Sequence, residues 1–169
     1  MNLLITITKT LHLHPERMRE GVIAAVHEGT ALLEKNVKQR APVGVGGAAG
    51  LKGSIFGEVT PAATRVEGIV GTPIGYAMPV EFGRRAGAAM PPVSALIPWV
   101  EAKITLKQGE KAEGVAWAIA RYMAQRGSRS WRSSPPGERM FLRGFEASVP
   151  GIIRIFEQRT IDVLARTME

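Results

Sequence analysis

The stretch PERMREGVIAAVHEGTALLEKNVKQR, residues 15–40, predicts one long amphipathic helix. Pro15 suits the first helical position, and Glu16 is favourable in the first turn, where the helix dipole is positive. Apolar residues recur every three or four positions and form one stripe: Met18, Val22, Val26, Leu33 and Val37, with Thr30 between them. Because Pro42 disfavours helix at the residue before it, we expect the helix to end at Arg40.

Three strand candidates follow this helix. They are separated by glycine, proline and threonine, as in an antiparallel meander, and they comprise Lys52–Thr60, Arg65–Gly71 and Gly75–Gly83. Pro79 cannot donate to a strand ladder, so the third strand is expected at a sheet edge or at a bulge. A further short strand is predicted at residues 3–8, where apolar residues alternate at period two.

The C-terminal half is predicted to be mainly helical. Ser94–Leu106 fits a helix interrupted near Pro98, and Gly109–Arg126 fits a second one. In the second helix four apolar side chains are expected to face the core, namely Val115, Ile119, Tyr122 and Met123. Gly127–Pro136 fits an exposed loop.

The last helix is expected to begin after a break at Pro150-Gly151 and to carry two apolar stripes. One stripe comprises Ile152, Phe156, Thr160, Val163 and Thr167, and the other comprises Ile153, Ile161, Leu164 and Met168. Two apolar faces exceed what a surface helix of a monomer requires, which indicates contact with another subunit.

Length and composition narrow the class of protein. A chain of 169 residues fits one domain, and we expect a single domain over residues 1–169 with a helical and loop insertion at about 94–139. The absence of cysteine excludes disulfides, thiolate catalysis and cysteine-type zinc sites. No uncharged run reaches the roughly 18 residues that a membrane helix needs, and no basic leader precedes the first apolar stretch. We therefore expect a soluble, intracellular protein without membrane contact.

Residues that could carry catalysis are sparse. The chain has three histidines and a single aspartate, Asp162, which makes a Ser-His-Asp set or a metal site unpromising. The Gly44–Gly50 segment lacks the lysine and glycine spacing of phosphate-binding loops. A small hydrolase would have to draw its carboxylates from Glu58, Glu67 and Glu81. We therefore expect that this protein is not an enzyme and binds no cofactor or metal.

Positive charge is concentrated late in the sequence. The net charge is +7, and the segment from Arg121 to Arg143 holds six arginines against one acid, Glu138. Such a segment fits a solvated loop, a phosphate contact or an acidic partner surface. Trp131 lies between Arg129 and Arg132, where a large aromatic residue fits a partner anchor. Two further tryptophans lie in apolar surroundings and are expected in the core: Trp99 and Trp117.

Several short motifs resemble one known family when they are taken in order. They are Arg40-Ala-Pro-Val43, Gly50-Leu-Lys-Gly-Ser-Ile55, Val70-Gly71 and Tyr76-Ala-Met-Pro-Val-Glu-Phe-Gly83. The combination is similar to the neck proteins of tailed phages, the gene-product-ten-like tail components also called head–tail joining or tail completion proteins. The match covers about Arg40–Pro92. Lys52 replaces the usual arginine, and Val45–Gly50 replaces a compact turn.

The resemblance implies an α+β fold in which a long N-terminal helix packs on a small antiparallel sheet, with additional helices and a C-terminal helix. It also implies a homo-oligomeric ring, commonly of six subunits, in the virion neck. Such a ring assembles in the host cytoplasm and contacts the head connector or stopper on one side and the tail tube or terminator on the other. Genomic DNA passes through its lumen without sequence-specific binding.

Two groups of residues are the candidate contact sites. The family motif is expected at the subunit interface and comprises Tyr76, Ala77, Val80, Glu81, Phe82 and Gly83. Contacts to partner rings are expected from Arg84, Arg85, Arg129, Trp131 and Arg132. Alternatives are a tail terminator that caps the tube, a basic nucleic-acid-binding protein, whose affinity would fall steeply with salt, and the small hydrolase considered above.

Overall fold

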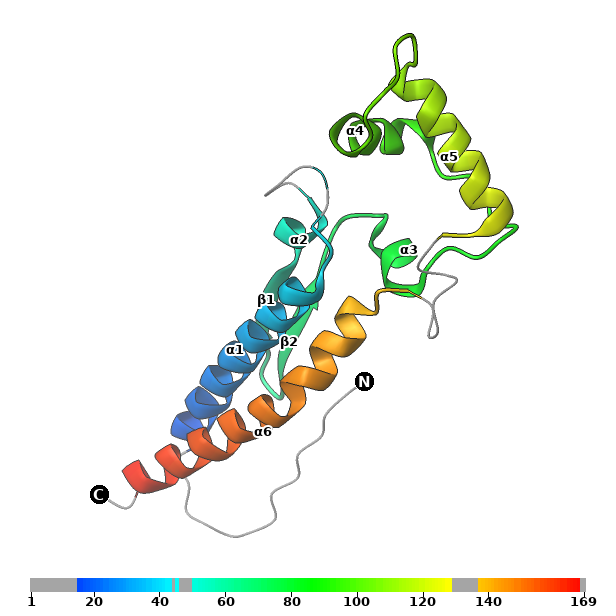
Figure 1. Ribbon diagram of the computed structural model, residues 1–169. Helices are drawn as coiled ribbons and strands as arrows, with labels where there is room; N and C mark the ends of the chain where they lie inside the picture. Colours follow the sequence, from blue (N-terminus) through cyan, green and yellow to red (C-terminus); the bar gives the residue numbers. More distant parts are fainter. Residues whose placement is uncertain (1–14, 44, 46–49, 129–136, 168–169) are drawn as a thin grey trace.

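The computed structural model describes residues 15–43, 45, 50–128 and 137–167 (Figure 1). Within these ranges the chain forms a mixed α+β fold with one two-stranded antiparallel sheet. Its elements in chain order are α1 (Pro15–Arg40), α2 (Leu51–Ser54), β1 (Phe56–Pro61), β2 (Val66–Gly71), α3 (Ala77–Phe82), α4 (Val93–Lys103), α5 (Ala112–Arg126) and α6 (Met140–Thr167). The predicted fold class is confirmed, and the predicted bounds of the first helix agree with those of α1.

Helices α1 and α6 lie side by side along most of their length (Figure 1). They are antiparallel, because the start of α1 meets the end of α6. The position that a Cβ atom would occupy on Gly21 (its Cβ position) lies 2.5 Å from Cγ2 of Val163. At the other end the Cβ position of Gly144 lies 2.5 Å from Cγ2 of Val37. Each of these glycines therefore leaves room for an apolar side chain of the opposite helix, and the two backbones approach closely.

Polar contacts fix how α1 and α6 align. Nδ2 of Asn36 donates to Oγ of the buried Ser148 over 2.9 Å. Nearer the far end, Arg159 on α6 donates to the Glu28 carboxylate on α1. That hydrogen bond and the charge of Glu28 raise the pKa of the Arg159 guanidinium above its ordinary value. Arg159 stays positively charged, and since both side chains are solvent-exposed the pair adds alignment more than stability.

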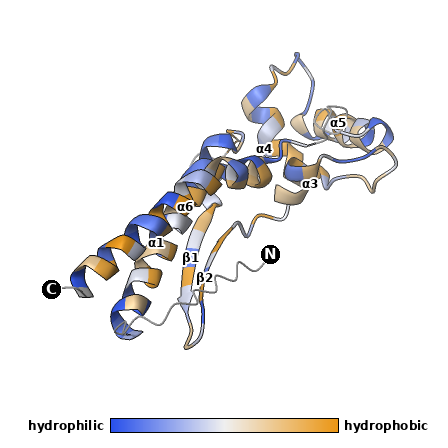
Figure 2. Ribbon diagram, turned by 90° about the horizontal axis from the view of Figure 1, so that it is seen from below, coloured by the Kyte–Doolittle hydropathy of each residue, from blue (hydrophilic) through white to orange (hydrophobic). Residues whose placement is uncertain are grey.

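The β1–β2 hairpin packs on the side of α1 that carries Thr30 (Figure 2). Thr30 is buried, and its Cγ2 lies 2.8 Å from the Cβ position of Gly57. The Gly57 amide donates to Oε2 of Glu34 over 2.8 Å, which ties β1 to α1. The strand register pairs Phe56 with Gly71. Helix α1 thus contacts both α6 and the hairpin.

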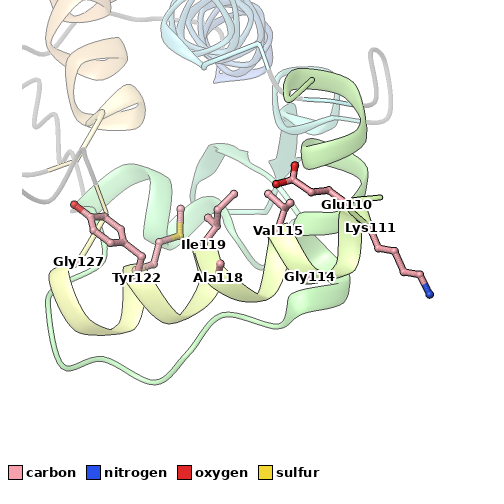
Figure 3. Close-up of a pocket in the computed structure, with 9 residues that line it drawn as sticks. Glu110, Lys111, Gly114, Val115, Ala118, Ile119, Tyr122 and Gly127 are labelled. Atoms are coloured by element: carbon pink, nitrogen blue, oxygen red, sulfur yellow. The ribbon is translucent and has the colours of Figure 1, made fainter. Parts of the chain in front are cut away.

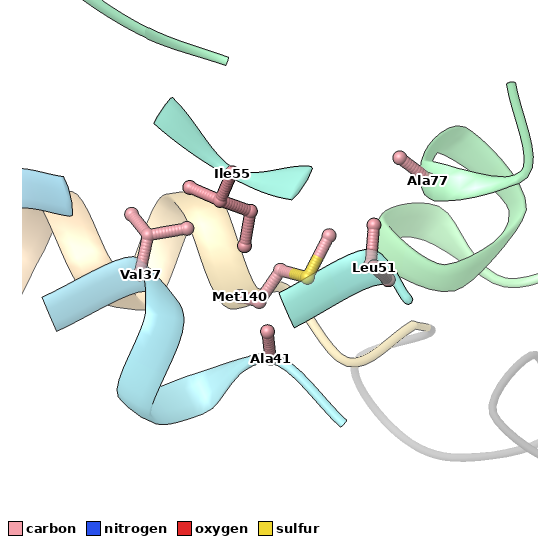
Figure 4. Close-up of a cluster of buried hydrophobic side chains, with 6 residues drawn as sticks. All are labelled: Val37, Ala41, Leu51, Ile55, Ala77 and Met140. Atoms are coloured by element: carbon pink, nitrogen blue, oxygen red, sulfur yellow. The ribbon is translucent and has the colours of Figure 1, made fainter. Parts of the chain in front are cut away.

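A small core closes the end of this body where four helices meet (Figure 4). It draws residues from α1, from the segment that follows α1, and from α2, α3 and α6, and consists of Val37, Ala41, Leu51, Ile55, Ala77 and Met140. All six are at least nine-tenths buried. The core therefore depends on segments that are far apart in the sequence.

Helices α4 and α5 pack on one another and project from the body as an arm (Figure 1). The arm is the segment from Val93 to Arg126. Its root is held where the Ser128 amide donates to the Arg84 carbonyl over 2.8 Å and the Gly87 amide donates to the Ala124 carbonyl over 2.8 Å. The arm occupies the region in which the sequence predicts an insertion.

The prediction of a three-stranded meander is wrong. The Arg65–Gly71 candidate is confirmed as β2, but the first candidate strand begins with the helical turn α2, and β1 starts only at Phe56. The third candidate, Gly75–Gly83, forms the short helix α3. Pro79 is the third residue of α3, where no intrahelical bond needs its missing N–H. The expected edge strand at Pro79 does not form. The predicted strand at residues 3–8 lies outside the described residues.

Two helical predictions also need correction. The expected break at Pro150-Gly151 is absent, because α6 runs unbroken from Met140 to Thr167. Contacts with α1 hold the helix on both sides of the proline, at Ser148 and at Gly151, whose Cβ position lies 2.6 Å from Cδ2 of Leu32. The two central helices are shorter than the sequence indicates, ending at Lys103 for α4 and beginning at Ala112 for α5.

Replacing Gly144 by alanine should destabilise the protein. The added methyl would lie 2.5 Å from Cγ2 of Val37 and 3.0 Å from its backbone, so α1 and α6 would have to separate locally. We expect the free energy of unfolding to fall by about 1–3 kcal/mol, as measured by urea denaturation followed by circular dichroism. The matched control is Gly114→Ala on α5, where nothing lies within 4 Å and a gain of about 0.5–1 kcal/mol is expected. Equal effects of the two substitutions would contradict this account of the packing.

Candidate functional site

The Tyr76–Gly83 motif divides into buried and exposed residues. Ala77 and Glu81 are buried, and Val80 packs against the core. Their spacing of three and four residues places them on one side of α3. Tyr76 and Phe82 lie about half exposed, and Gly83 follows the helix with a φ of 73°, a left-handed value that glycine adopts at little cost. The motif therefore serves the core with one face and leaves two aromatic rings free for contact.

Glu81 has a structural role that its sequence context did not indicate. Its side chain is 5% exposed, and its two carboxylate oxygens accept from the first turn of α6: the Phe141 amide donates to Oε2 over 2.9 Å and the Leu142 amide donates to Oε1 over 3.1 Å. These amides have no partner within the helix, so the carboxylate caps α6 and also complements the positive end of its dipole. The Arg139 amide donates to the backbone carbonyl of Glu81 over 3.0 Å.

The carboxylates proposed for a hydrolase have different surroundings. Glu58 and Glu67 lie exposed on the hairpin, whereas Glu81 is buried and both its oxygens are engaged by α6. Within the described ranges no group of three or more histidine or acidic side chains is arranged to hold a metal ion. No helix there is both long and apolar enough to cross a bilayer.

The arginines predicted as partner contacts are only partly described. Arg84 is engaged at the root of the arm: its amide donates to Oγ of Ser128 over 2.9 Å, and its guanidinium donates to the Ala89 carbonyl. Arg85 is exposed. The remaining three candidates, Arg129, Trp131 and Arg132, lie outside the described residues. Of this group, Arg85 thus has its side chain placed on the surface, and Arg84 instead holds the arm to the body.

The first candidate surface is an apolar stripe along α6. Leu142, Phe145 and Ile153 recur at helical spacing beside the face that packs on α1, and Ile161 continues the apolar surface further along. Ile153 is 53% and Ile161 is 58% exposed. Figure 2 shows that apolar residues recur along the whole of α6. Ile152 and Val163 of the first predicted stripe contact α1, whereas Ile153 and Ile161 of the second are exposed. Leu164 of the second stripe is partly buried, and Met168 lies outside the described residues.

The second candidate surface is the outer face of the hairpin, which is the face turned away from α1. Phe56 is 47% and Ile69 is 54% exposed there. Since the described sheet has two strands, each strand also has one edge without a strand partner among the described residues. Unpaired edges and exposed apolar side chains beside them are features that an isolated soluble subunit normally avoids.

The third candidate surface is the arm. A groove of about 700 Å³ runs along α5 and is lined by Val115, Ala118, Ile119, Tyr122 and Met123 (Figure 3). These side chains were expected in the core, and that expectation is wrong because α5 packs on α4 through Ala116 and Ala120, which are fully buried. Trp99 and Trp117 are likewise half-exposed rather than buried, since the described arm has only two helices and no third layer to cover them.

Substituting Glu81 by alanine should weaken the whole body. Two amides at the start of α6 would lose their acceptor in a buried setting, and we expect a loss of about 1–3 kcal/mol in the free energy of unfolding. The exposed Glu138, just before α6, is the matched control, and its replacement by alanine should change stability by less than about 0.5 kcal/mol. Urea denaturation measures both. If Glu81→Ala costs no more than Glu138→Ala, the capping role is wrong.

Comparison with known proteins adds no family to this description. No family model, no curated protein and no solved structure matches the chain. The resemblance of Arg40–Pro92 to phage neck proteins thus stays a prediction from sequence motifs.

Proposed function

We propose that this chain is a structural subunit of a tailed-phage neck, where copies of it form a ring that joins the head connector to the tail. The observation that supports this proposal most is the balance of apolar residues. Among the described residues, fifteen large apolar side chains are exposed, whereas ten apolar residues are buried and five of those are alanine. A subunit that completes its burial only in an assembly has this balance.

The position of the exposed apolar residues also favours an assembly. Nine of the fifteen lie on α6, on the hairpin and on the arm, which are separate parts of an elongated molecule (Figures 1 and 2). Contacts between different surfaces of identical subunits are heterologous, and such contacts close into rings when the rotation between neighbours permits. The resemblance of the motifs from Arg40 to Pro92 supports a position of this ring at the phage neck.

The charge of the chain is compatible with that setting. A net charge of +7 favours the neighbourhood of DNA and of acidic partner surfaces without requiring recognition of a base sequence. A subunit in this role needs complementary surfaces and no reacting group. Glu81, the motif carboxylate, accordingly serves the fold through α6.

Imaging of purified virions tests the proposal. The phage that encodes this chain would be grown with the chain carrying a small C-terminal tag, and the tag would be located by antibody labelling and electron microscopy. Label at the head–tail junction supports the proposal. Label on free tails that have not met a head would instead identify a tail terminator, and label inside the capsid or absence from the particle would contradict a neck function.

Polar substitutions on the α6 stripe should impair particle assembly. We expect the double variant Phe145→Ser with Ile153→Ser to reduce the yield of complete particles at least tenfold in a complementation assay, because its surface no longer offers apolar contact area. The helical circular dichroism should be retained, since both residues are partly exposed. The control is Arg154→Ser with Glu157→Ser, which replaces two exposed charged side chains of the same helix and leaves its apolar residues in place. Equal yields from the two double variants would show that the stripe is not an assembly surface.

A further inference from the structure

The outer face of the hairpin has the form of a receptor for an aromatic side chain. Phe56 is paired across the strands with Gly71, and nothing lies within 4 Å of the Cβ position of Gly71. The space above the Gly71 backbone, beside the exposed Phe56 ring, is therefore open. A flat side chain placed there would cover the glycine and contact the edge of the Phe56 ring. The next pair on the same face is Glu58 with Ile69.

This face is also acidic. Glu58 and Glu67 both lie on it, because alternate residues of a strand share a face and Glu67 pairs with Thr60. Glu67 has an ion-pair partner in Arg65, with 3.4 Å between Oε2 and Nη2. The Glu58 carboxylate has no hydrogen bond or ion pair within the described part of the chain. A cation next to the aromatic group would thus find a carboxylate that is free to bind it.

One helix of the same protein carries this pair of groups. On α5, Trp117 is 48% exposed, and Cζ of Arg121 lies 5.4 Å from the centroid of its ring. The guanidinium forms no ion pair with any described residue. Ala116 and Ala120 face α4, so the Trp117–Arg121 pair occupies an exposed flank of the arm. Tryptophan and arginine are the residue types most often dominant in protein interfaces.

The spacing of the two surfaces matches. Residues four apart on a helix are separated by about 6 Å along its axis, and alternate residues of a strand by about 6.6 Å. If Trp117 lies on Gly71 beside Phe56, Arg121 reaches the Glu58 and Ile69 pair. The next step along both elements brings Gln125 close to Thr60. The match thus includes shape, charge and repeat distance.

We infer that the Trp117–Arg121 flank of one subunit docks on the Phe56, Glu58 and Gly71 face of a neighbouring copy. The occupant is a second copy and not the same chain, because α5 packs on α4 and has no substantial contact with the hairpin. The contact joins an arm to a body, so it repeats from one subunit to the next in one direction around a ring. This inference rests on the proposed function, and it names the surfaces that such a ring would use.

Cysteine trapping tests the inference directly, because the natural sequence has no cysteine. Full-length Thr60→Cys and Gln125→Cys proteins would be mixed under mild oxidation, and disulfide-linked heterodimers would be measured by non-reducing electrophoresis over a range of concentrations. Both positions are exposed and neither belongs to the inferred contact pairs. The control replaces Gln125→Cys by Arg126→Cys, which is the next residue on α5 and faces about 100° away. We expect initial heterodimer formation to be at least tenfold faster with Gln125→Cys.

Two further sets of variants test whether the trapping is specific. Adding Trp117→Ala to the Gln125→Cys protein should abolish the tenfold difference. Independently, Glu58→Arg in the Thr60→Cys protein should slow trapping, and Arg121→Glu in its partner should restore it. Trapping no faster than the Arg126→Cys control at every concentration would overturn the inference, as would charge reversal without effect.

The outcome separates this inference from the proposed function. Label at the virion neck without specific trapping would overturn the arm-to-hairpin contact and leave the neck assignment in place. Specific trapping without label in the virion would support the contact between copies and overturn the assignment to the neck.

Discussion

The close approach of α1 and α6 is the constraint on which the rest of the structure depends. Glycines on both helices receive apolar side chains from the opposite helix, so that Gly21 accommodates Val163 and Gly144 accommodates Val37. This reciprocal packing brings the two backbones together with few large residues. Ile153 and Ile161 of α6 remain on its outer side. A narrow internal seam and an apolar exterior are thus two results of the same arrangement.

Small residues also form other contacts between elements of the molecule. The hairpin approaches α1 at Gly57, and α5 meets α4 through Ala116 and Ala120. Because small residues form each of these internal contacts, tryptophan, phenylalanine and isoleucine side chains remain available at the surface. Many large apolar side chains thus stay exposed, which agrees with the proposed role as an assembly subunit.

Sequence periodicity predicted part of this structure and missed the rest for identifiable reasons. The bounds of α1 and the course of β2 follow from proline positions and apolar spacing, which act locally. The α1–α6 seam was missed because glycine and alanine do not register as an apolar stripe, although the repeat Gly21, Ala25, Gly29 was a usable signal. The alternation in Tyr76–Gly83 predicts a strand, whereas the spacing of Ala77, Val80 and Glu81 fits the helix that forms there. The cap on α6 joins residues about 60 positions apart, and no local pattern predicts it.

The Glu81 cap has a mechanical consequence. Only Phe82 and Gly83 separate Glu81 from Arg84, which anchors the arm through Ser128. A pull on the arm therefore reaches the first turn of α6 through three residues of chain and two carboxylate hydrogen bonds. A partner that binds the arm would therefore also load the start of α6, the longest helix. That load would pass to the packed pair of helices α1 and α6.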